Sequence, residues 1–533
     1  MLDRKVMMSS WKSLSLKEQI AQMIVVRASG YLFDHQIRYP AWEANNNKLQ
    51  RWLKELNLGG VILLGGSSIE LQKRSQILQS WAKIPLLIAA DIEEGIGQRF
   101  PGGTWFPPPM ALSEIYDFNP QLALEYAAKM GKVTATEAIA VGINWLLAPV
   151  VDVNNNPSNP VINIRAFGES TEVVSALGTA FINGAKSHPV LTTAKHFPGH
   201  GDTATDSHLE LPSLPHDDTR LAQIELPPFQ AAIAAGVDSV MTAHLSIPAW
   251  DNKPATLSTE IITGKLRQQL GFSGLVVTDA LIMGGITKYA SPEEAAILAV
   301  EAGNDILLMP DNPEVAIASI YDAVQSGRIG KERIEQSLER IWQAKAKVSN
   351  VDITPALSTS EARKTVDLIV QNSLVTANVP SIASVKDNSR NLIVVDDVLN
   401  ASYLDLNAPA IAIPQQLGYQ RQIVDSNSIN CILSDRPTLL QVFIRGNPFR
   451  GNAGLTDKTK QIYRQLIERE KVEAIVIYGS PYVLDWFKSF VNSKLPYVFT
   501  YGQMKQAQAI ALTTLYNLNS EVKQSKSLSN FGF

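Results

Sequence analysis

The segment Lys195–His208 concentrates side chains that can transfer a proton or bind a polar ligand. It holds three of the seven histidines of the 533-residue chain, with one lysine and two aspartates. Asp206 and His208 stand two residues apart, so their side chains share a face in extended backbone. A carboxylate beside an imidazole holds its tautomer and raises its pKa, which makes a competent proton donor near neutral pH. The pair therefore indicates acid–base catalysis. The alternative is a loop histidine that is hydrogen-bonded by a neighbouring aspartate.

A metal site is a second interpretation of the same segment. His196, His200 and His208 with Asp206 are residue types that zinc uses as ligands. Their spacing matches no standard zinc motif. We therefore expect no metal here.

A dinucleotide site is a third interpretation. Gly199–Ala204 formally satisfies the pattern G-x-G-x-x-A, which in a dinucleotide-binding fold must open directly into a helix. Here Pro198 precedes the pattern, and the proline-rich stretch Leu211–Pro215 follows soon after. These residues predict a loop, so the match is accidental and no cofactor is expected.

Several short apolar runs end in polar residues, which indicates where the remaining chemistry lies. The third run leads into Asp91–Glu94, the fourth into Asp152, the fifth into Lys195 and His196, the sixth into His244 and the seventh into Asp279. One aspartate at a strand end is usually a helix cap. Five such ends are hard to explain as caps, and in a parallel barrel they converge on one face.

The elements that must position these residues form an alternating pattern over the first 350 residues. Eight apolar runs predict strands, and amphipathic stretches such as Pro120–Ala140, which Asn119 can cap, predict helices between them. The predicted strands are Met23–Val26, Gly60–Leu64, Leu86–Ala90, Asn144–Val150, Leu191–Lys195, Ser239–Ala243, Leu275–Asp279 and Asp305–Met309. Eight β-then-α units favour an α/β fold of the (β/α)₈ TIM-like barrel type, and an open doubly wound sheet is the rival.

A second, smaller domain is expected after the barrel. The helical stretch Lys331–Lys347 ends a barrel of residues 1–348, residues 349–359 form a linker, and residues 360–533 form an α/β sandwich. This sandwich begins with a helix over Ser360–Asn372. Its predicted strands are Leu392–Val395, Ala410–Ile413, Leu440–Ile444, Ala474–Tyr478 and Pro496–Thr500. The segment Arg445–Arg450 is expected to be a surface turn, in preference to a loop that approaches the barrel mouth.

Composition and charge narrow the function class and the location. A hydrophobic content of 45% with 18% charged residues is typical of a soluble globular protein. The net charge of −4 and the scattered basic residues argue against nucleic acid as a partner. No apolar run approaches the roughly 20 residues of a membrane helix, and no signal segment is recognised at the start. With a single cysteine, Cys431, these features lead us to expect a cytoplasmic protein.

The motifs resemble those of bacterial β-N-acetylhexosaminidases of glycoside hydrolase family 3. The resemblance covers the barrel half almost end to end and the second half only weakly. Besides Lys195–Gly201 with Asp206–His208, the matching segments are Asp91–Gly95 with Gln98–Phe100, Asn163–Gly168, Met241–His244 and Gly274–Leu281.

This resemblance implies a retaining mechanism with a covalent glycosyl-enzyme intermediate. Asp279 resembles the nucleophile, His208 the general acid/base, and Asp206 the residue that orients His208. A charged imidazole attracts the nucleophile's carboxylate, whereas a second carboxylate would repel it. The proton donor can therefore be carried by a mobile loop, and we hypothesise that residues 199–205 form such a loop ahead of His208.

The resemblance also implies which residues bind the sugar. The positions that match sugar-binding residues are Asp91, Arg99, Arg165, Lys195 and His196, and His244 and Met283 are expected to line the same pocket.

The activity implied is that of an exo-β-N-acetylglucosaminidase that acts on cell-wall fragments in a recycling pathway. The substrate is then a small-molecule glycoside of N-acetylglucosamine, with no cofactor and no metal. A β-glucosidase or an N-acetylglucosaminide phosphorylase of the same family stays open as an alternative. A carbohydrate-binding protein without activity is the alternative from another class.

Overall fold

The computed structural model describes residues 10–207, 209–349, 355–379, 385, 387–397, 401–425, 428, 436–446, 454–469, 472–492 and 494–518. His208 therefore lies outside the described residues. The same holds for residues 350–354 of the expected linker, for residues 447–450 of the expected surface turn and for Cys431.

The first part of the chain is a barrel of eight parallel strands. Hydrogen-bonded pairing gives the orders β10-β1-β2-β3-β4 and β5-β6-β9. Isolated bridges from Trp145 to Leu191 and from Val277 to Ile306 join the two sheets into a closed ring. The strands are β1 Ile24–Ser29, β2 Gly60–Leu64, β3 Leu87–Ala90, β4 Trp145–Leu146, β5 Thr193–Phe197, β6 Ser239–Thr242, β9 Leu275–Thr278 and β10 Leu307–Leu308. The ring confirms the predicted barrel and excludes the open sheet.

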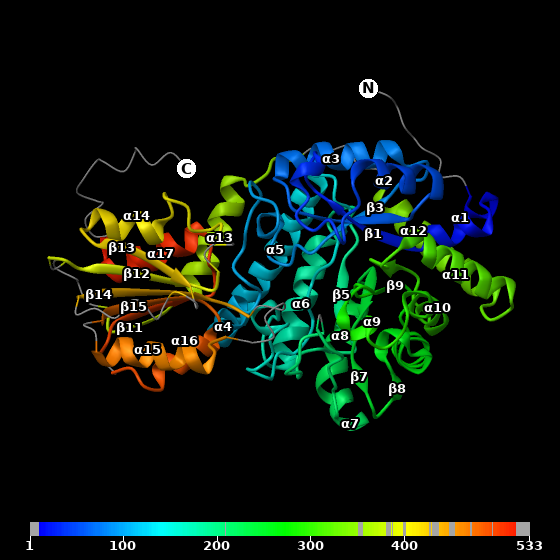
Figure 1. Cartoon of the computed structure of the whole chain (residues 1–533). Helices are drawn as coiled ribbons and strands as arrows, with labels where there is room; N and C mark the ends of the chain where they lie inside the picture. Colours follow the sequence, from blue (N-terminus) through cyan, green and yellow to red (C-terminus); the bar gives the residue numbers. More distant parts are fainter. Residues whose placement is uncertain are drawn as a thin grey trace.

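Helices surround the barrel strands (Figure 1). The helix α5 begins at Pro120, where the Asn119 side chain accepts a hydrogen bond from the Leu122 amide, so the predicted start is confirmed. The α-helices of this part are α1 Leu16–Ala21, α2 Asn46–Arg51, α3 Ser68–Trp81, α4 Ala111–Phe118, α5 Pro120–Ala140, α6 Thr171–Ala185, α7 Asp218–Arg220, α8 Leu226–Ala234, α9 Gly284–Thr287, α10 Pro292–Ala302, α11 Pro313–Gln325 and α12 Lys331–Val348. Further segments are the hairpin β7 Ser246–Ile247 and β8 Asp251–Pro254, the 3-10 turns η1 Trp11–Ser13, η2 Asp34–Gln36, η4 Ile96–Gln98, η5 Asn163–Arg165 and η7 Ala255–Leu257, and the π-helical η3 Trp52–Leu56, η6 Leu221–Glu225 and η8 Glu260–Gln269.

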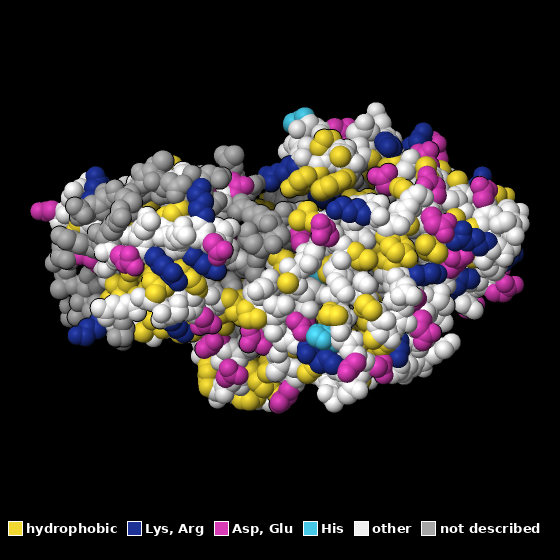
Figure 2. Space-filling view, turned by 60° about the horizontal axis from the view of Figure 1, so that its bottom comes forward, with side chains coloured by type: hydrophobic (Ala, Val, Ile, Leu, Met, Phe, Trp, Pro, Cys, Tyr) yellow, Lys and Arg dark blue, Asp and Glu magenta, His cyan; other side chains and the backbone are white. Residues whose placement is uncertain are grey.

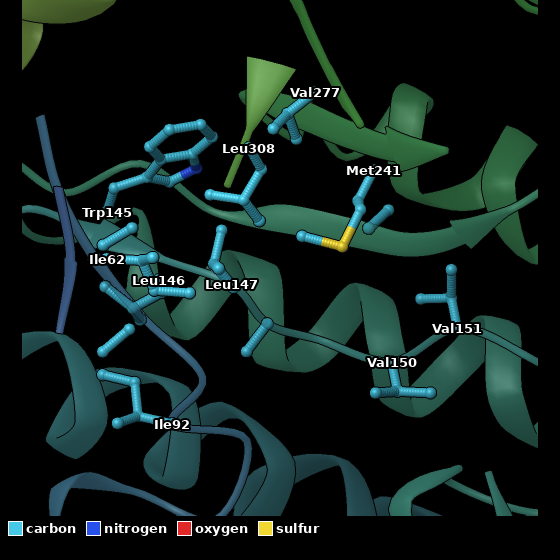
Figure 3. Packing of buried hydrophobic residues seen from close by; sticks show 14 of the residues in the cluster. Ile62, Ile92, Trp145, Leu146, Leu147, Val150, Val151, Met241, Val277 and Leu308 are labelled. Carbon is cyan, nitrogen blue, oxygen red and sulfur yellow. The ribbon is translucent and has the colours of Figure 1, made fainter. Parts of the chain in front are cut away.

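The interior of the barrel is packed with apolar side chains. Figure 3 shows Ile62, Leu146, Met241 and Leu308 among the buried residues that different strands contribute. A filled interior supports the strand ends, and the polar chemistry is left to the mouth of the barrel.

The second part of the chain is a six-stranded sheet between two layers of helices. The strand order is β11-β16-β15-β14-β12-β13, and only β11 runs antiparallel to its neighbour. Figure 1 shows α14 and α17 on one face of this sheet and α15 and α16 on the other. The elements are α13 Ser360–Asn372, β11 Val375–Ala377, β12 Arg390–Val395, α14 Pro409–Gln416, β13 Gln420–Asp425, β14 Thr438–Ile444, α15 Asp457–Arg469, β15 Val472–Gly479, α16 Pro481–Lys488, β16 Tyr497–Thr500 and α17 Lys505–Tyr516.

One predicted strand of the sandwich is wrong. Ala410–Ile413 lies in helix α14, where Pro409 occupies the first turn and the Gln508 side chain accepts a hydrogen bond from the Ala410 amide. A short apolar run is compatible with a strand or a buried helix, and here the proline at its start favours the helix. The strands β11 and β13 were not predicted. Most side chains of these strands are exposed or half-buried.

The surface carries both signs of charge. On the face shown in Figure 2, Lys and Arg side chains lie among Asp and Glu side chains and form no continuous basic patch. In the part of the chain that the structure describes, none of the helices combines the length and apolarity that a membrane crossing requires.

Candidate active site

A buried lysine joins two strand ends at the barrel mouth. Lys195 lies on β5, and its side chain is 1% exposed. Its Nζ is 2.8 Å from Asp91 Oδ1 and 2.7 Å from Glu93 Oε1, both in the segment that follows β3. An ammonium group can be buried at acceptable cost only when carboxylates surround it in this way. Lys195 and Asp91, two of the predicted sugar-binding residues, are thus in direct contact, and Glu93 also binds Lys195.

Glu93 also binds the predicted residue Arg165. The guanidinium of Arg165 donates from Nε to Glu93 Oε2 at 2.9 Å and from Nη2 to Glu93 Oε1 at 2.7 Å. Burial raises the pKa of Glu93, but the charges of Arg165 and Lys195 outweigh burial and hold this pKa well below its ordinary value. Burial lowers the pKa of Arg165, and Glu93 more than compensates, so the pKa is raised. Both groups are therefore held in their charged forms by this mutual contact.

Arg99 lies at the exposed rim of the same group. Its Nε donates to the backbone carbonyl of Asp91 at 3.1 Å, and its side chain is exposed. The segment folds back on itself, because the Phe106 amide donates to the carbonyl of Glu94. Gly95 has a φ of 86°, a conformation that favours glycine. Arg99 and Asp91 are thereby held on one short loop.

His196 is oriented by a buried aspartate at the end of the fourth unit. Asp152 accepts a hydrogen bond from His196 Nδ1 at 2.8 Å and further bonds from the backbone amides of His196 and His200. Burial raises the pKa of Asp152. The charge of His196 and the hydrogen bonds lower this pKa by more than burial raises it, so it lies below its ordinary value. An ionised Asp152 fixes Nδ1 of His196 as a donor, which leaves Nε2 for other interactions.

His200 anchors the segment that carries Asp206. Burial lowers the pKa of His200 to about 4, although the charges of Asp152 and Asp279 oppose this effect. The neutral ring contacts Thr203 Oγ1 at 2.8 Å through Nδ1 and Ser207 Oγ at 3.1 Å through Nε2. His200 is therefore a structural residue of this segment.

The same segment rests against the strand end of Asp279. The amide of Gly285, in α9, donates to the carbonyl of Ser207 at 3.2 Å, and Asp206 is buried. No helix follows Gly199–Ala204 before Asp218 among the described residues, which confirms the predicted loop. The pairing of Asp206 with His208 stays a prediction.

Asp279 follows β9 and is half-buried. Its amide donates to the carbonyl of Thr242, and its Oδ1 accepts from the Ala280 amide at 2.7 Å. The buried His244 donates from Nε2 to the carbonyl of Ala280 at 3.0 Å and contacts Thr256 Oγ1 through Nδ1 at 2.8 Å. Met283 is buried and stands just before α9. His244 thus supports the backbone beside Asp279, and a sugar contact from His244 or Met283 stays a prediction.

The predicted residues occupy consecutive units of the ring. They lie on β5 or in the segments that follow β3, β4, β5, β6 and β9, and these strands are neighbours in the closed barrel. Sequence reasoning had not assigned a role to Glu93 or to Asp152. The signal was the run of acids after the third strand and the lone aspartate after the fourth. Two acids beside one lysine predict a shared ion pair only when the strands are known to be neighbours.

The arrangement can bind a polar, uncharged ligand and can attack it. Carboxylates and cations alternate at one end of the mouth, which suits the hydroxyl groups and the amide of a sugar. The half-buried carboxylate of Asp279 is a group of the type that serves as a nucleophile, and this role stays a prediction. In the described ranges, no three His, Cys, Asp or Glu side chains lie together in a way that could hold a metal ion.

Comparison with known proteins agrees with this geometry. Residues 15–344 match the model of the glycosyl hydrolase family 3 N terminal domain, and residues 382–517 match that of the bacterial glycosyl hydrolase family 3 C-terminal domain. The chain is 36% identical over 348 residues to beta-hexosaminidase A of Pseudoalteromonas piscicida, a match that covers 59% of this chain and 57% of that protein. It is 34% identical over 296 residues to the beta-hexosaminidase of Nitrosomonas eutropha, covering 54% of this chain and 85% of that protein.

A solved structure resembles the chain over nearly its whole length. The family 3 beta-N-acetylglucosaminidase from Paenibacillus sp. str. FPU-7 superposes with a TM-score of 0.79 at 28% identity, covering 95% of this chain and 97% of that one. The likeness therefore includes both the barrel and the second sheet. The chain spans little more than half of the Pseudoalteromonas protein.

Proposed function

Because this chain belongs to glycosyl hydrolase family 3, we propose that it is a retaining exo-β-N-acetylglucosaminidase. In this proposal it removes terminal β-linked N-acetylglucosamine from peptidoglycan fragments in the cytoplasm. The observation that carries the proposal is the buried Lys195 between Asp91 and Glu93, on the same mouth as the half-buried Asp279. The names of the related beta-hexosaminidases support N-acetylglucosamine as the sugar that is removed. The motif match supports the roles proposed for the individual residues.

In this mechanism Asp279 is the nucleophile. Its carboxylate attacks the anomeric carbon and forms the glycosyl–enzyme bond while the bond to the leaving group breaks. His208 gives its proton to the leaving oxygen and then takes one from the water that hydrolyses the intermediate. Asp206 orients and polarises His208. The contact of Gly285 with Ser207 supports these roles, since it ties the segment of Asp206 to the helix that follows Asp279.

Asp91, Arg99, Arg165, Lys195 and His196 bind the terminal sugar in this proposal. The alternation of fixed positive and negative groups discriminates hydroxyl positions, because each charged group left without its partner costs free energy. The barrel of residues 1–348 supplies these groups, and residues 360–533 form the second domain beyond a linker.

The proposal is tested by comparing nitrophenyl β-N-acetylglucosaminide with the β-glucoside, each with and without phosphate. We expect the N-acetylglucosaminide to be hydrolysed faster, with no effect of phosphate. Asp279→Ala should lower its turnover by at least about 1,000-fold, while Asp322→Ala, at an exposed aspartate of α11, should not. His208→Ala should slow an unactivated disaccharide more than the nitrophenyl substrate, because a poor leaving group needs the proton most.

Other results would overturn the proposal. A preference for the glucoside would indicate a β-glucosidase, and sugar 1-phosphate formed only with phosphate would indicate a phosphorylase. Binding of N-acetylglucosamine without turnover of either substrate would indicate a carbohydrate-binding protein.

A further inference from the structure

An arginine of the second domain reaches into the barrel. Arg445 directly follows β14, and its Nη2 lies 2.6 Å from Oε1 of Glu94, with Nη1 at 3.4 Å from Oε2. The side chain of Glu94 is 0% exposed and that of Arg445 is 24% exposed. Trp105 Nε1 donates to Glu94 Oε2 at 2.9 Å. The expectation of a surface turn is therefore wrong for Arg445. No local pattern indicates this contact, because it joins residues 351 positions apart.

This ion pair completes a balance of charges at the sugar-binding end of the mouth. The segment after β3 carries three carboxylates within four residues, and three cations face them. The carboxylates are Asp91, Glu93 and Glu94, and the cations are Lys195, Arg165 and Arg445. Burial lowers the pKa of Arg445, but Glu94 and, more weakly, Glu93 raise it above its ordinary value. Without Arg445, a buried carboxylate would remain beside Glu93 without its cation.

The next residue of the second domain contacts the other sugar-binding loop. A Cβ atom at Gly446 would lie 3.1 Å from Cβ of Asn163 and 3.3 Å from the carbonyl oxygen of Pro160, so the two backbones approach closely. Asn163 begins the turn that carries Arg165. One short stretch of the second domain thus touches the loop of Asp91 and Arg99 and the loop of Arg165.

We propose that Arg445 is a positioning residue for the sugar site, through which the second domain holds the loop Asp91–Phe106 in its binding conformation. The proposal rests on the proposed function for the nature of the ligand. Arg445 acts through Glu94. Removing the charges of both residues therefore restores most of the substrate affinity that is lost when Arg445 alone is replaced. The second domain thus supplies a residue that positions a loop of the barrel mouth.

The test uses the full chain and four variants, Arg445→Met, Arg445→Lys, Glu94→Gln and the double variant Glu94→Gln/Arg445→Met. Arg445→Met is expected to raise the KM for nitrophenyl β-N-acetylglucosaminide about tenfold or more, with a smaller change in kcat, because ground-state sugar contacts are displaced. The double variant and Arg445→Lys should recover most of the affinity. Arg328→Met is the matched control. It removes an arginine bound to Glu294 and Glu301 on the outside of the barrel, and its KM should equal that of the unmodified protein.

Amide hydrogen exchange of residues 91–106 is the second readout, and it needs no turnover. Exchange should rise in Arg445→Met and return in the double variant. Unchanged exchange and KM in Arg445→Met would overturn the proposal, as would a double variant as impaired as Arg445→Met, since Arg445 would then act on the sugar directly. If the unmodified protein hydrolyses no N-acetylglucosaminide, the proposed function fails, and the exchange data alone decide the role of Arg445.

Discussion

Lys195 is the residue on which the charged end of the mouth depends. Its ammonium group is shared by Asp91 and Glu93, and Glu93 in turn fixes Arg165. Each of these groups is buried or half-buried, so the loss of any partner leaves a buried charge unpaired and lowers the free energy of unfolding. The sequence identified Lys195 and Asp91 because both stand at strand ends. It could not identify Glu93 as the link between them, since Glu93 has no sequence neighbour among its partners.

Replacement of Lys195 by methionine should affect both activity and stability. We expect Lys195→Met to lower kcat/KM at least about 100-fold and the free energy of unfolding by about 3 kcal/mol, because Asp91 and Glu93 would then repel each other. Steady-state kinetics and urea unfolding measure the two effects. Lys186→Met is the control, since Lys186 is exposed and donates only to the carbonyl of Ala235 among the contacts described. An active, fully stable Lys195→Met protein would contradict this account.

Helix α12 contains a buried lysine whose effect on the free energy of unfolding depends on pH. Lys345 Nζ donates to Gln22 Oε1 at 2.6 Å, and burial lowers the pKa of Lys345 to about 7. In the unfolded chain this pKa returns to about 10.4. Between these two values the unfolded state binds more protons than the folded state. The free energy of unfolding therefore rises as the pH increases through this window, and below pH 7 the full cost of burying a charged lysine is present.

Lys345→Met should remove this dependence. Between pH 7 and pH 9.5 we expect the lysine to add roughly 3 kcal/mol to the rise in the unfolding free energy of the unmodified protein. The methionine variant should lack this rise and be the more stable protein at pH 7. Urea unfolding of both proteins at the two pH values checks it. Equal slopes against pH in the two proteins would show that Lys345 is not buried in its neutral form.

The elements differed in how far the sequence could predict them. The helix α5 was predicted with its bounds, because Asn119 and Pro120 determine its start locally. The eight barrel strands were also found, since each is an apolar run with a helix after it. Ala410–Ile413 was assigned to the wrong kind of element, because four apolar residues carry no period that separates strand from helix. Arg445 was misplaced for a different reason, as its partner Glu94 lies on another domain.

One apolar cluster spans both domains, and a second cluster lies within the second domain alone. A single cluster of buried residues runs from the barrel strands to Val366 of α13, Val442 of β14 and Phe487 of α16. Polar contacts reinforce this junction: Tyr482 donates to Glu169 at 2.5 Å and Tyr501 to Glu114 at 3.3 Å. A shared core couples the unfolding of the parts that contribute to it.

We therefore expect the barrel and the second domain to unfold together. Differential scanning calorimetry should show one transition, with a calorimetric enthalpy close to the van't Hoff enthalpy. Val442→Ala, which opens a cavity in β14 on the shared face, should lower the midpoint of the whole transition. Two well-separated transitions, with only the smaller one shifted by Val442→Ala, would show that the domains are thermodynamically independent.

The position of β14 has a consequence for chimeric proteins. β14 lies between β12 and β15 in the middle of its sheet, so its register is fixed on both sides, and Arg445 leaves it at a defined height and direction. A domain taken from a relative and grafted onto this barrel would bring a similar sheet, but it would neutralise the buried Glu94 only with a cationic side chain at the end of the corresponding strand. The compatibility of such grafts thus requires this cation at the junction in addition to a matching apolar face.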